Sequence, residues 1–254
     1  MKPYYEEDGI TIFHGDCREV LPSLKSNIVL TDPPYGMNSN PDLQRFSGRV
    51  TRRGGGWRKH DRTFGDKEPF DAEHLLSFQK VIIWGANHFW NTLPRGGCLV
   101  WVKRRPLAFG TFLSDAEIAF ESGIHGVYCF ERIFAGSQKA MDAGFDAHAQ
   151  SAHPNQKPVE LMSWCLNRCG DGCVLDPYMG SGTTLVAAKL AGRRAVGIEI
   201  VEKYCEIAAK RLSQKVFRFE DQHSTVSGRV SPAQQNTLAA AMEEMPQEVD
   251  GPRE

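Results

Sequence analysis

The stretch Asp176-Pro177-Tyr178-Met179-Gly180-Ser181-Gly182-Thr183-Thr184 follows the apolar run Cys173-Val174-Leu175 and leads into a helical pattern at 183–191. An apolar run, a glycine turn and a helix in this order are typical of a parallel α/β sheet. The glycines permit a tight turn and a close approach of the backbone to a ligand, and the serine and the two threonines can cap the helix. Ligands of open parallel sheets bind beyond the carboxyl ends of the strands, so a ligand site is predicted beside Asp176.

A second acidic residue indicates which kind of ligand this site holds. Glu199 ends the next apolar run, Ala195-Val196-Gly197-Ile198, where an acid can bind both hydroxyls of a ribose. No lysine follows the Gly-Ser-Gly turn and an aspartate precedes it, which argues against a phosphate-binding loop. A carboxylate suits a nucleoside cofactor that has a positive centre and no phosphates, and S-adenosylmethionine carries both a sulfonium and an ammonium. A turn with a purely structural role would leave Asp176 and Glu199 unexplained.

The segment His153-Pro154-Asn155-Gln156-Lys157-Pro158 precedes this half of the chain. Its prolines stiffen it, and Pro158 suits the first turn of a helix over 158–168. Lys157 and Asn155 can then point toward the carboxylate of the cofactor, and Gln156 and Pro177 are further cofactor-binding candidates. Taken alone, the segment also fits a plain junction between a loop and a helix.

The motif Asp32-Pro33-Pro34-Tyr35-Gly36 follows another apolar run, Asn27-Ile28-Val29-Leu30. An exocyclic amine on a nucleic-acid base is a poor nucleophile, because its lone pair is delocalised into the ring. Asp32 and the carbonyl of Pro33 can accept hydrogen bonds from the two N–H groups, while the rings of Pro33 and Pro34 stiffen the backbone. Tyr35 offers a face on which an extruded base can stack. The motif therefore predicts methylation of a base amine, with a rate gain from positioning and electrostatics.

Strand and helix patterns alternate along most of the chain. They predict a single doubly wound, mostly parallel α/β sheet of seven strands, with an antiparallel edge formed by 116–120 and 126–133. A helix is also expected at 70–80. We expect one domain over 1–212, with a long loop at 36–67 and a short irregular segment at 135–156. An acidic, disordered tail is expected at 213–254.

The composition excludes several classes of protein. Hydrophobic residues make up 41% of the chain and charged residues 24%, which is ordinary for a globular protein, and no apolar run approaches the length of a membrane span. The N-terminal residues lack the apolar core of a secretion signal, and the seven cysteines are an odd count, so we expect reduced thiols in a cytoplasm. Cys165, Cys169 and Cys173 have no nearby histidine as a fourth zinc ligand, and no metal is expected. His88 and His153 could line the cleft, but a structural role is the default interpretation for both.

The loop at 36–67 contains eight arginine or lysine residues against three aspartates, although the net charge of the whole chain is −1. A basic segment in a near-neutral protein is a candidate for contacts with phosphates, and a solvated, flexible loop is the alternative. The DNA-binding candidates in this loop are Arg45, Arg49, Arg52, Arg53, Trp57, Arg58 and Lys59.

These motifs resemble those of the DNA amino-methyltransferases of the beta group. In that family an Asp-Pro-Pro-Tyr block comes first, and the blocks His-Pro-x-Gln-Lys-Pro and Asp-Pro-x-x-Gly-Ser-Gly-Thr-Thr come last. The resemblance covers roughly residues 8–212 and implies a circularly permuted class I S-adenosylmethionine-dependent methyltransferase fold. Segment 12–17 resembles the opening block of the family, which implies that Asp16 contacts the adenine side of the cofactor. Segments 85–89 and 114–117 are similar to versions carried by bacteriophages and prophages.

The chain departs from the family in one respect. Larger members insert a sizeable recognition domain between the two halves, whereas this sequence has only the irregular segment 135–156 at that place. We therefore expect the loop at 36–67 to make much of the contact with DNA.

The resemblance implies methylation of adenine N6 in double-stranded DNA, because family members with Asp in the Asp-Pro-Pro-Tyr block mostly act on adenine. Cytosine N4 is the alternative target, since both bases present an amidine-like amine. A glutamine-methylating enzyme is a third interpretation, which Asp32 disfavours because that group resembles Asn-Pro-Pro-Tyr. A catalytically idle DNA-binding module is the alternative from a different class. By analogy we expect a monomer or homodimer that acts in restriction-modification.

Overall fold

The structure is a computed structural model that describes residues 2–37, 64–104, 109–110, 114–133 and 156–214. The chain divides into two compact units, Met1–Lys215 and Val216–Glu254, of which the second lies outside the described residues. The expected tail at 213–254 and the segments 36–67 and 135–156 thus lie mostly outside the described part, and their roles stay predictions. Among the described residues, no helix has both the length and the apolar character that crossing a membrane requires.

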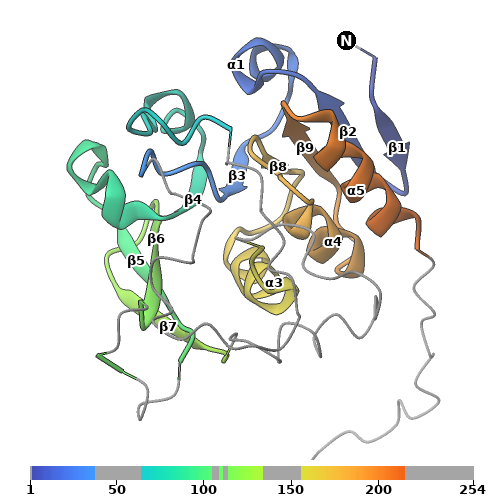
Figure 1. The fold of residues 1–254 in the computed structure, drawn as a ribbon. Coiled ribbons are helices and arrows are strands. Elements are labelled where there is room, and N and C mark those ends of the chain that lie inside the picture. Colours follow the sequence, from blue (N-terminus) through green and yellow to red (C-terminus); the bar gives the residue numbers. More distant parts are fainter. Residues whose placement is uncertain (1, 38–63, 105–108, 111–113, 134–155, 215–254) are drawn as a thin grey trace, which may run out of the picture. The chain divides into compact units, whose positions relative to one another are not determined.

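A mixed β-sheet forms the centre of the first unit (Figure 1), and its fold class agrees with the sequence prediction. In the described part of the chain it has nine strands in the order β1-β2-β9-β8-β3-β4-β6-β5-β7. The five strands from β2 to β4 in this order run parallel. The strands are β1 (Tyr5–Glu7), β2 (Ile10–His14), β3 (Ile28–Thr31), β4 (Lys80–Trp84), β5 (Gly97–Val102), β6 (Ala116–Glu121), β7 (Val127–Glu131), β8 (Val174–Asp176) and β9 (Ala195–Glu199).

The sheet exceeds the expected seven strands partly because β1 pairs antiparallel with β2 in a tight hairpin. Asp8 and Gly9 form its two-residue turn, and both have positive φ angles, 50° and 78°. An Asp-Gly pair is a typical turn of this kind, but a strand of three residues is too short to show a period in the sequence.

The far edge of the sheet corrects the expectation of two antiparallel edge strands. Only β6 runs antiparallel to both of its neighbours, whereas β7 lies parallel to β5 on its outer side. The link at 122–126 must therefore pass the start of β5. Glycine makes this possible, because a Cβ atom on Gly97 would lie 2.4 Å from Cδ1 of Ile124 and 2.9 Å from the carbonyl oxygen of Gly126.

Helices cover both faces of the sheet, as expected for a parallel α/β sheet. On β3, Ile28 and Leu30 pack into a cluster with residues of α3, α4 and α5, while Val29 packs on the other face with residues of α1 and η3. The α-helices are α1 (Cys17–Val20), α3 (Val159–Arg168), α4 (Thr183–Leu190) and α5 (Glu202–Ser213), and the 3-10 helices are η1 (Leu21–Ser23), η3 (Glu73–Leu75), η4 (Ala86–His88) and η5 (Trp90–Thr92).

The helix expected at 70–80 is wrong. Only the single turn η3 forms there, and the carboxylate of Asp71 accepts a hydrogen bond from the amide of Glu73 (3.0 Å) at its start. Aspartate competes with helix formation by such local bonds. One turn suffices to bury Ala72 and Leu75.

A buried ion network joins β4, β6 and α3. The side chain of Glu121 is only 1% exposed and lies 2.6 Å from Nζ of Lys80 and 2.7 Å from Nη2 of Arg168. A buried carboxylate needs such partners, since desolvation of an isolated charge is costly.

Replacement of Glu121 by glutamine should lower the free energy of unfolding by about 2–3 kcal/mol, because the substitution leaves two cations with no anionic partner at this place. Both cations are about one-fifth exposed, which keeps the loss below that of a fully buried pair. Urea denaturation monitored by circular dichroism measures it. An exposed pair, Glu206 with Lys210, provides the control, and Glu206→Gln should leave the stability nearly unchanged because solvent screens exposed ion pairs. Equal effects of the two substitutions would contradict the assignment.

Candidate functional site

A single cavity of about 360 Å³ lies at the carboxyl ends of β2, β3, β8 and β9, and both sequence motifs line it. Asp32 and Tyr35 enter it from the end of β3, and Asp176 and Gly180 from the end of β8. The other predicted site residues that line it are Asp16, Pro33, Pro34, Gln156, Lys157, Pro177, Ser181, Thr183, Thr184 and Glu199. Parallel strands thus bring to one place residues that are far apart in the sequence.

Asp176 is the most deeply buried acid of the cavity, with an exposed fraction of 3%. Its Oδ1 accepts hydrogen bonds from the hydroxyl of Thr31 (2.7 Å) and from the amide of Tyr178 (3.2 Å). Burial raises the pKa of Asp176 to about 6, although hydrogen bonds from Thr184 and Thr31 act in the opposite direction. A carboxylate held in this way is a strong acceptor for a cationic group once it is ionised.

The glycine turn after β8 has the backbone that its sequence predicts. Gly180 and Gly182 have φ angles of 51° and 77°, in the left-handed region that favours glycine. A Cβ atom on Gly182 would lie 2.8 Å from Cβ of Ala208 in α5, whereas one on Gly180 would meet nothing within 4 Å. Gly182 therefore permits close helix packing, and Gly180 leaves the backbone open toward the cavity.

The expected capping of α4 by hydroxyl side chains is wrong. Gly182 is the N-cap residue, and no side chain caps the helix. The hydroxyl of Thr184 instead bonds Asp176, and Nη1 of Arg211 in α5 donates to the carbonyl (2.5 Å) and hydroxyl (3.3 Å) oxygens of Ser181.

Two further acids lie at the ends of the neighbouring strands. Glu199 accepts hydrogen bonds from the amides of Gly180 (3.0 Å) and Val201 (2.8 Å), and burial raises its pKa. The hydrogen bond from the Gly180 amide joins the end of β9 to the glycine turn after β8. Asp16 accepts from the amide of Arg18 (2.9 Å) and is the N-cap residue of α1. Carboxylate oxygens have further lone pairs, so both acids can also accept from a ligand.

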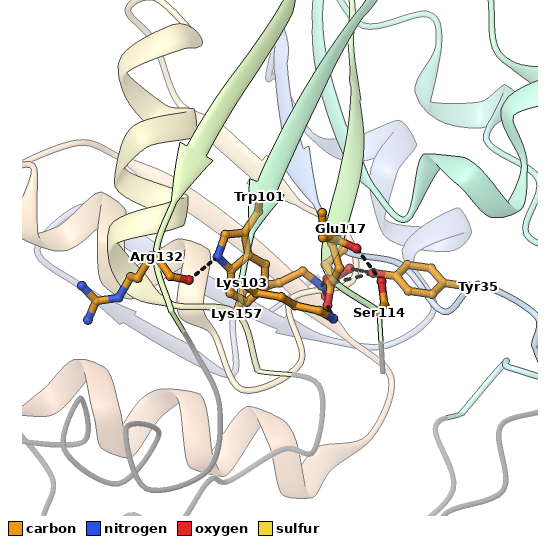
Figure 2. A network of polar contacts seen from close by, with 9 residues as sticks. Tyr35, Trp101, Lys103, Ser114, Glu117, Arg132 and Lys157 are labelled. Carbon is orange, nitrogen blue, oxygen red and sulfur yellow. Dashed lines mark hydrogen bonds and ion pairs between the residues drawn. The ribbon is translucent and has the colours of Figure 1, made fainter. Parts of the chain in front are cut away.

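Both carboxylate oxygens of Asp32 are hydrogen-bonded. Oδ1 accepts from the hydroxyl of Tyr35 (2.5 Å), and Oδ2 accepts from Nζ of Lys157 (2.6 Å). Lys157, which is only 5% exposed, also lies 3.1 Å from the hydroxyl of Tyr35 and 3.1 Å from Oε2 of Glu117 (Figure 2). The sequence predicted Lys157 as a partner of a cofactor carboxylate, whereas the structure places its ammonium against two protein carboxylates.

The ring of Tyr35 contacts His88 and lies close to Gly85, neither of which belongs to the Asp-Pro-Pro-Tyr motif. It stacks on the imidazole of His88 with ring centroids 4.9 Å apart and an interplanar angle of 14°. Gly85 makes room for it, since a Cβ atom there would lie 1.9 Å from Cε1 of the tyrosine. His88 is not among the residues that line the cavity, but it contacts the site through the ring of Tyr35.

Asp66 is another site residue that the sequence analysis missed, because it counted only as one charge in the basic loop. It is buried, and its Oδ1 accepts hydrogen bonds from the amides of Gly36 (3.0 Å) and Met37 (3.1 Å). It thereby fixes the backbone that follows the Asp-Pro-Pro-Tyr motif. Asn155 and all the DNA-binding candidates, Arg45, Arg49, Arg52, Arg53, Trp57, Arg58 and Lys59, lie outside the described residues.

Within the described ranges, no group of three or more histidine, cysteine or acidic residues is arranged to hold a metal ion. The seven cysteines are free thiols, and Cys165 and Cys169 are buried in the core.

Residues 121–210 match the model of a protein family described as DNA methylase. The chain is 26% identical to the Type II methyltransferase M.ScaI of Streptomyces caespitosus, over 83% of this chain and 84% of that protein. It is also 26% identical to the Type II methyltransferase M2.LlaDCHI of Lactococcus lactis subsp. cremoris, over 84% of this chain and 93% of that protein. Among solved structures, the cytosine-N4-specific PvuII DNA methyltransferase has a TM-score of 0.54 at 14% identity and covers 84% of this chain and 90% of its own, which shows a shared fold.

Replacement of Thr31 by the isosteric valine should raise the pKa of Asp176 above about 6, because it removes a hydrogen bond to the ionised carboxylate. Carbon-13 NMR of the side-chain carboxyl as a function of pH measures the shift. Thr92→Val is the control, since the hydroxyl of Thr92 bonds the carbonyl oxygen of Phe89 instead. An unchanged titration of Asp176 in Thr31→Val would show that this hydrogen bond does not act on the acid.

Proposed function

We propose that this chain, a DNA amino-methyltransferase by its sequence relationships, transfers a methyl group from S-adenosylmethionine to the N6 amine of adenine in double-stranded DNA. One observation carries the proposal: the Asp-Pro-Pro-Tyr motif and the glycine turn after β8 line the same cavity. The methyl donor and the acceptor amine of such a reaction must meet in one site, and this cavity offers a place for each.

The residues of the glycine turn after β8 and at the end of β9 fit a nucleoside cofactor with a positive centre. Asp176 offers a buried carboxylate to an ammonium, Glu199 offers one to ribose hydroxyls, and Gly180 leaves its backbone accessible. We assign the cofactor to these residues, together with Asp16, Gln156 and, by the resemblance of its segment, Asn155. When bound, S-adenosylmethionine supplies a methyl group made electrophilic by the sulfonium.

The residues of the other half fit an amine that must be made nucleophilic. Asp32 and the carbonyl of Pro33 accept hydrogen bonds from the amine and hold its nitrogen so that the lone pair points at the methyl group. The carboxylate of Asp32 is already oriented by Tyr35 and Lys157, so little reorganisation is required when the base enters. Tyr35 provides an aromatic surface for the extruded base.

The assignment to adenine rests on Asp32, because relatives with this acid in the motif mostly act on adenine. The carboxylate of Asp32 can accept a hydrogen bond from the N4 amine of cytosine equally well. We assign contact with DNA to Arg45, Arg49, Arg52, Arg53, Trp57, Arg58 and Lys59, because they lie in the basic loop at 36–67 that follows the Asp-Pro-Pro-Tyr motif.

Incubation of the protein with methyl-labelled S-adenosylmethionine and unmethylated, enzymatically amplified bacterial genomic DNA should transfer label to the DNA. Digestion to nucleosides should give labelled N6-methyldeoxyadenosine, while label in N4-methyldeoxycytidine would replace the adenine assignment. Asp32→Ala should reduce the transfer about 100- to 1,000-fold, because it removes an acceptor placed at the reacting nitrogen. Asp171→Ala, an exposed aspartate before β8, should have no effect. The absence of label in any DNA with the wild-type protein would overturn the proposed function.

The affinity for S-adenosylmethionine should depend on pH through Asp176. Because the pKa of this carboxyl is about 6 in the free protein, it is neutral below that pH and ionised above it. A cationic ligand binds the ionised form, so the Kd should rise by up to about tenfold per pH unit as the pH falls below 6. Isothermal titration calorimetry from pH 5 to 8 tests this, with Asp176→Asn expected to bind weakly and with little pH dependence. A constant Kd over this range would rule out Asp176 as the partner of the cation.

A further inference from the structure

Glu117 lies outside the motifs assigned above, yet it contacts the lysine that orients Asp32. It stands on β6 opposite Trp101 of β5. Its Oε2 lies 3.1 Å from Nζ of Lys157, and its Oε1 accepts a hydrogen bond from Nζ of Lys103 (2.7 Å), as Figure 2 shows. A row of alternating charges, Lys103, Glu117, Lys157 and Asp32, therefore runs from the end of β5 to the cavity.

Three oxygen atoms surround the ammonium of Lys157. It donates hydrogen bonds to Oδ2 of Asp32 (2.6 Å) and to the hydroxyl of Tyr35 (3.1 Å), and it forms an ion pair with Oε2 of Glu117 at 3.1 Å. To reach any other group, the ammonium would have to leave one of these partners. Its direction, and with it the position of the Asp32 oxygen that it bonds, is fixed from both sides.

The pKa values of Glu117 and Lys157 favour the charged form of both side chains. Burial alone would raise the pKa of Glu117, but Lys157 and Lys103 lower it to about 2. Burial alone would lower the pKa of Lys157, but Asp32 and Glu117 raise it well above its usual value. Glu117 and Lys157 are therefore both ionised at neutral pH.

We propose that Glu117 is a positioning residue for methyl transfer, which holds the Lys157 ammonium on Asp32 and so fixes the acceptor oxygen that meets the base amine. This inference rests on the proposed function. Without the Glu117 charge, Lys157 keeps Asp32 as its anionic partner but loses the second one on its other side. The ammonium can then turn about Asp32, and Oδ2 of Asp32 is held less firmly than Oδ1, which Tyr35 still bonds. A small displacement of a positioned group reduces the rate without affecting the binding of the cofactor, which other residues hold.

The test compares two carboxylates of the same strand. Glu117→Gln keeps the shape and removes the charge, Glu117→Asp keeps the charge and shortens the side chain, and Glu121→Gln removes the buried charge at the other end of β6. The rate of methyl transfer is measured under single-turnover conditions at saturating cofactor, with unmethylated, amplified genomic DNA. The Kd for S-adenosylmethionine is measured by calorimetry and the folded state by circular dichroism.

Glu117→Gln should reduce the transfer rate about 10- to 100-fold with less than a twofold change in the cofactor Kd, and Glu117→Asp should recover part of the rate. Glu121→Gln should lower stability and leave the rate of the folded protein unchanged. A Glu117→Gln rate equal to that of an active wild-type protein would overturn the inference, as would a loss confined to the cofactor Kd. If Glu117→Gln fails to fold, Glu117→Asp decides: a wild-type rate refutes the positioning role. An inactive wild-type protein would instead refute the proposed function.

Discussion

A hydrogen bond of 2.7 Å between the Thr31 hydroxyl and the Asp176 carboxylate joins two parts of the chain that are 145 residues apart in the sequence. It forms because β3 and β8 are parallel neighbours whose ends lie side by side. Asp32, the next residue after Thr31, is thereby held beside the acid that we assign to the cofactor. The Asp-Pro-Pro-Tyr motif is held by β3 and the glycine turn by β8, and the hydrogen bond joins these two parts of the site.

The acids in the cavity and next to it are stabilised in two different ways. Asp176 and Glu199 line the cavity and have mainly neutral donors, hydroxyls and backbone amides, and burial raises the pKa of both. Glu117 lies beside the cavity and has two lysines, which lower its pKa to about 2. An acid with neutral partners still has excess negative charge for a cationic ligand, whereas the charge of Glu117 is already neutralised by its lysines. This difference separates Asp176, which we assign to a cation, from Glu117, which we assign to the positioning of Lys157.

Much of the fold and the centre of the site could be predicted from the sequence, because each key acid directly follows an apolar run. Asp32, Asp176 and Glu199 are such residues, and parallel strands must bring their ends to one edge. The contact of Lys157 with Glu117 could not be predicted, since the segment at 114–117 gave no sign of a role in the site. The parallel course of β7 was also hidden, because it depends on the small size of Gly97 at a chain crossing. Local sequence patterns predict where strands lie and end, whereas the contacts between side chains and strands that are distant in the sequence depend on tertiary packing.

The stack of Tyr35 on His88 has a consequence for how a nucleobase is received. Ring centroids 4.9 Å apart leave no space for a third ring between them. A purine that stacks on the face of Tyr35 that His88 covers must therefore displace the imidazole of His88. The free energy of stacking gained by the purine is then reduced by the stacking lost with His88. If Asp32 binds the base as proposed, a heterocycle without an exocyclic amine within its reach would gain only this reduced free energy of stacking.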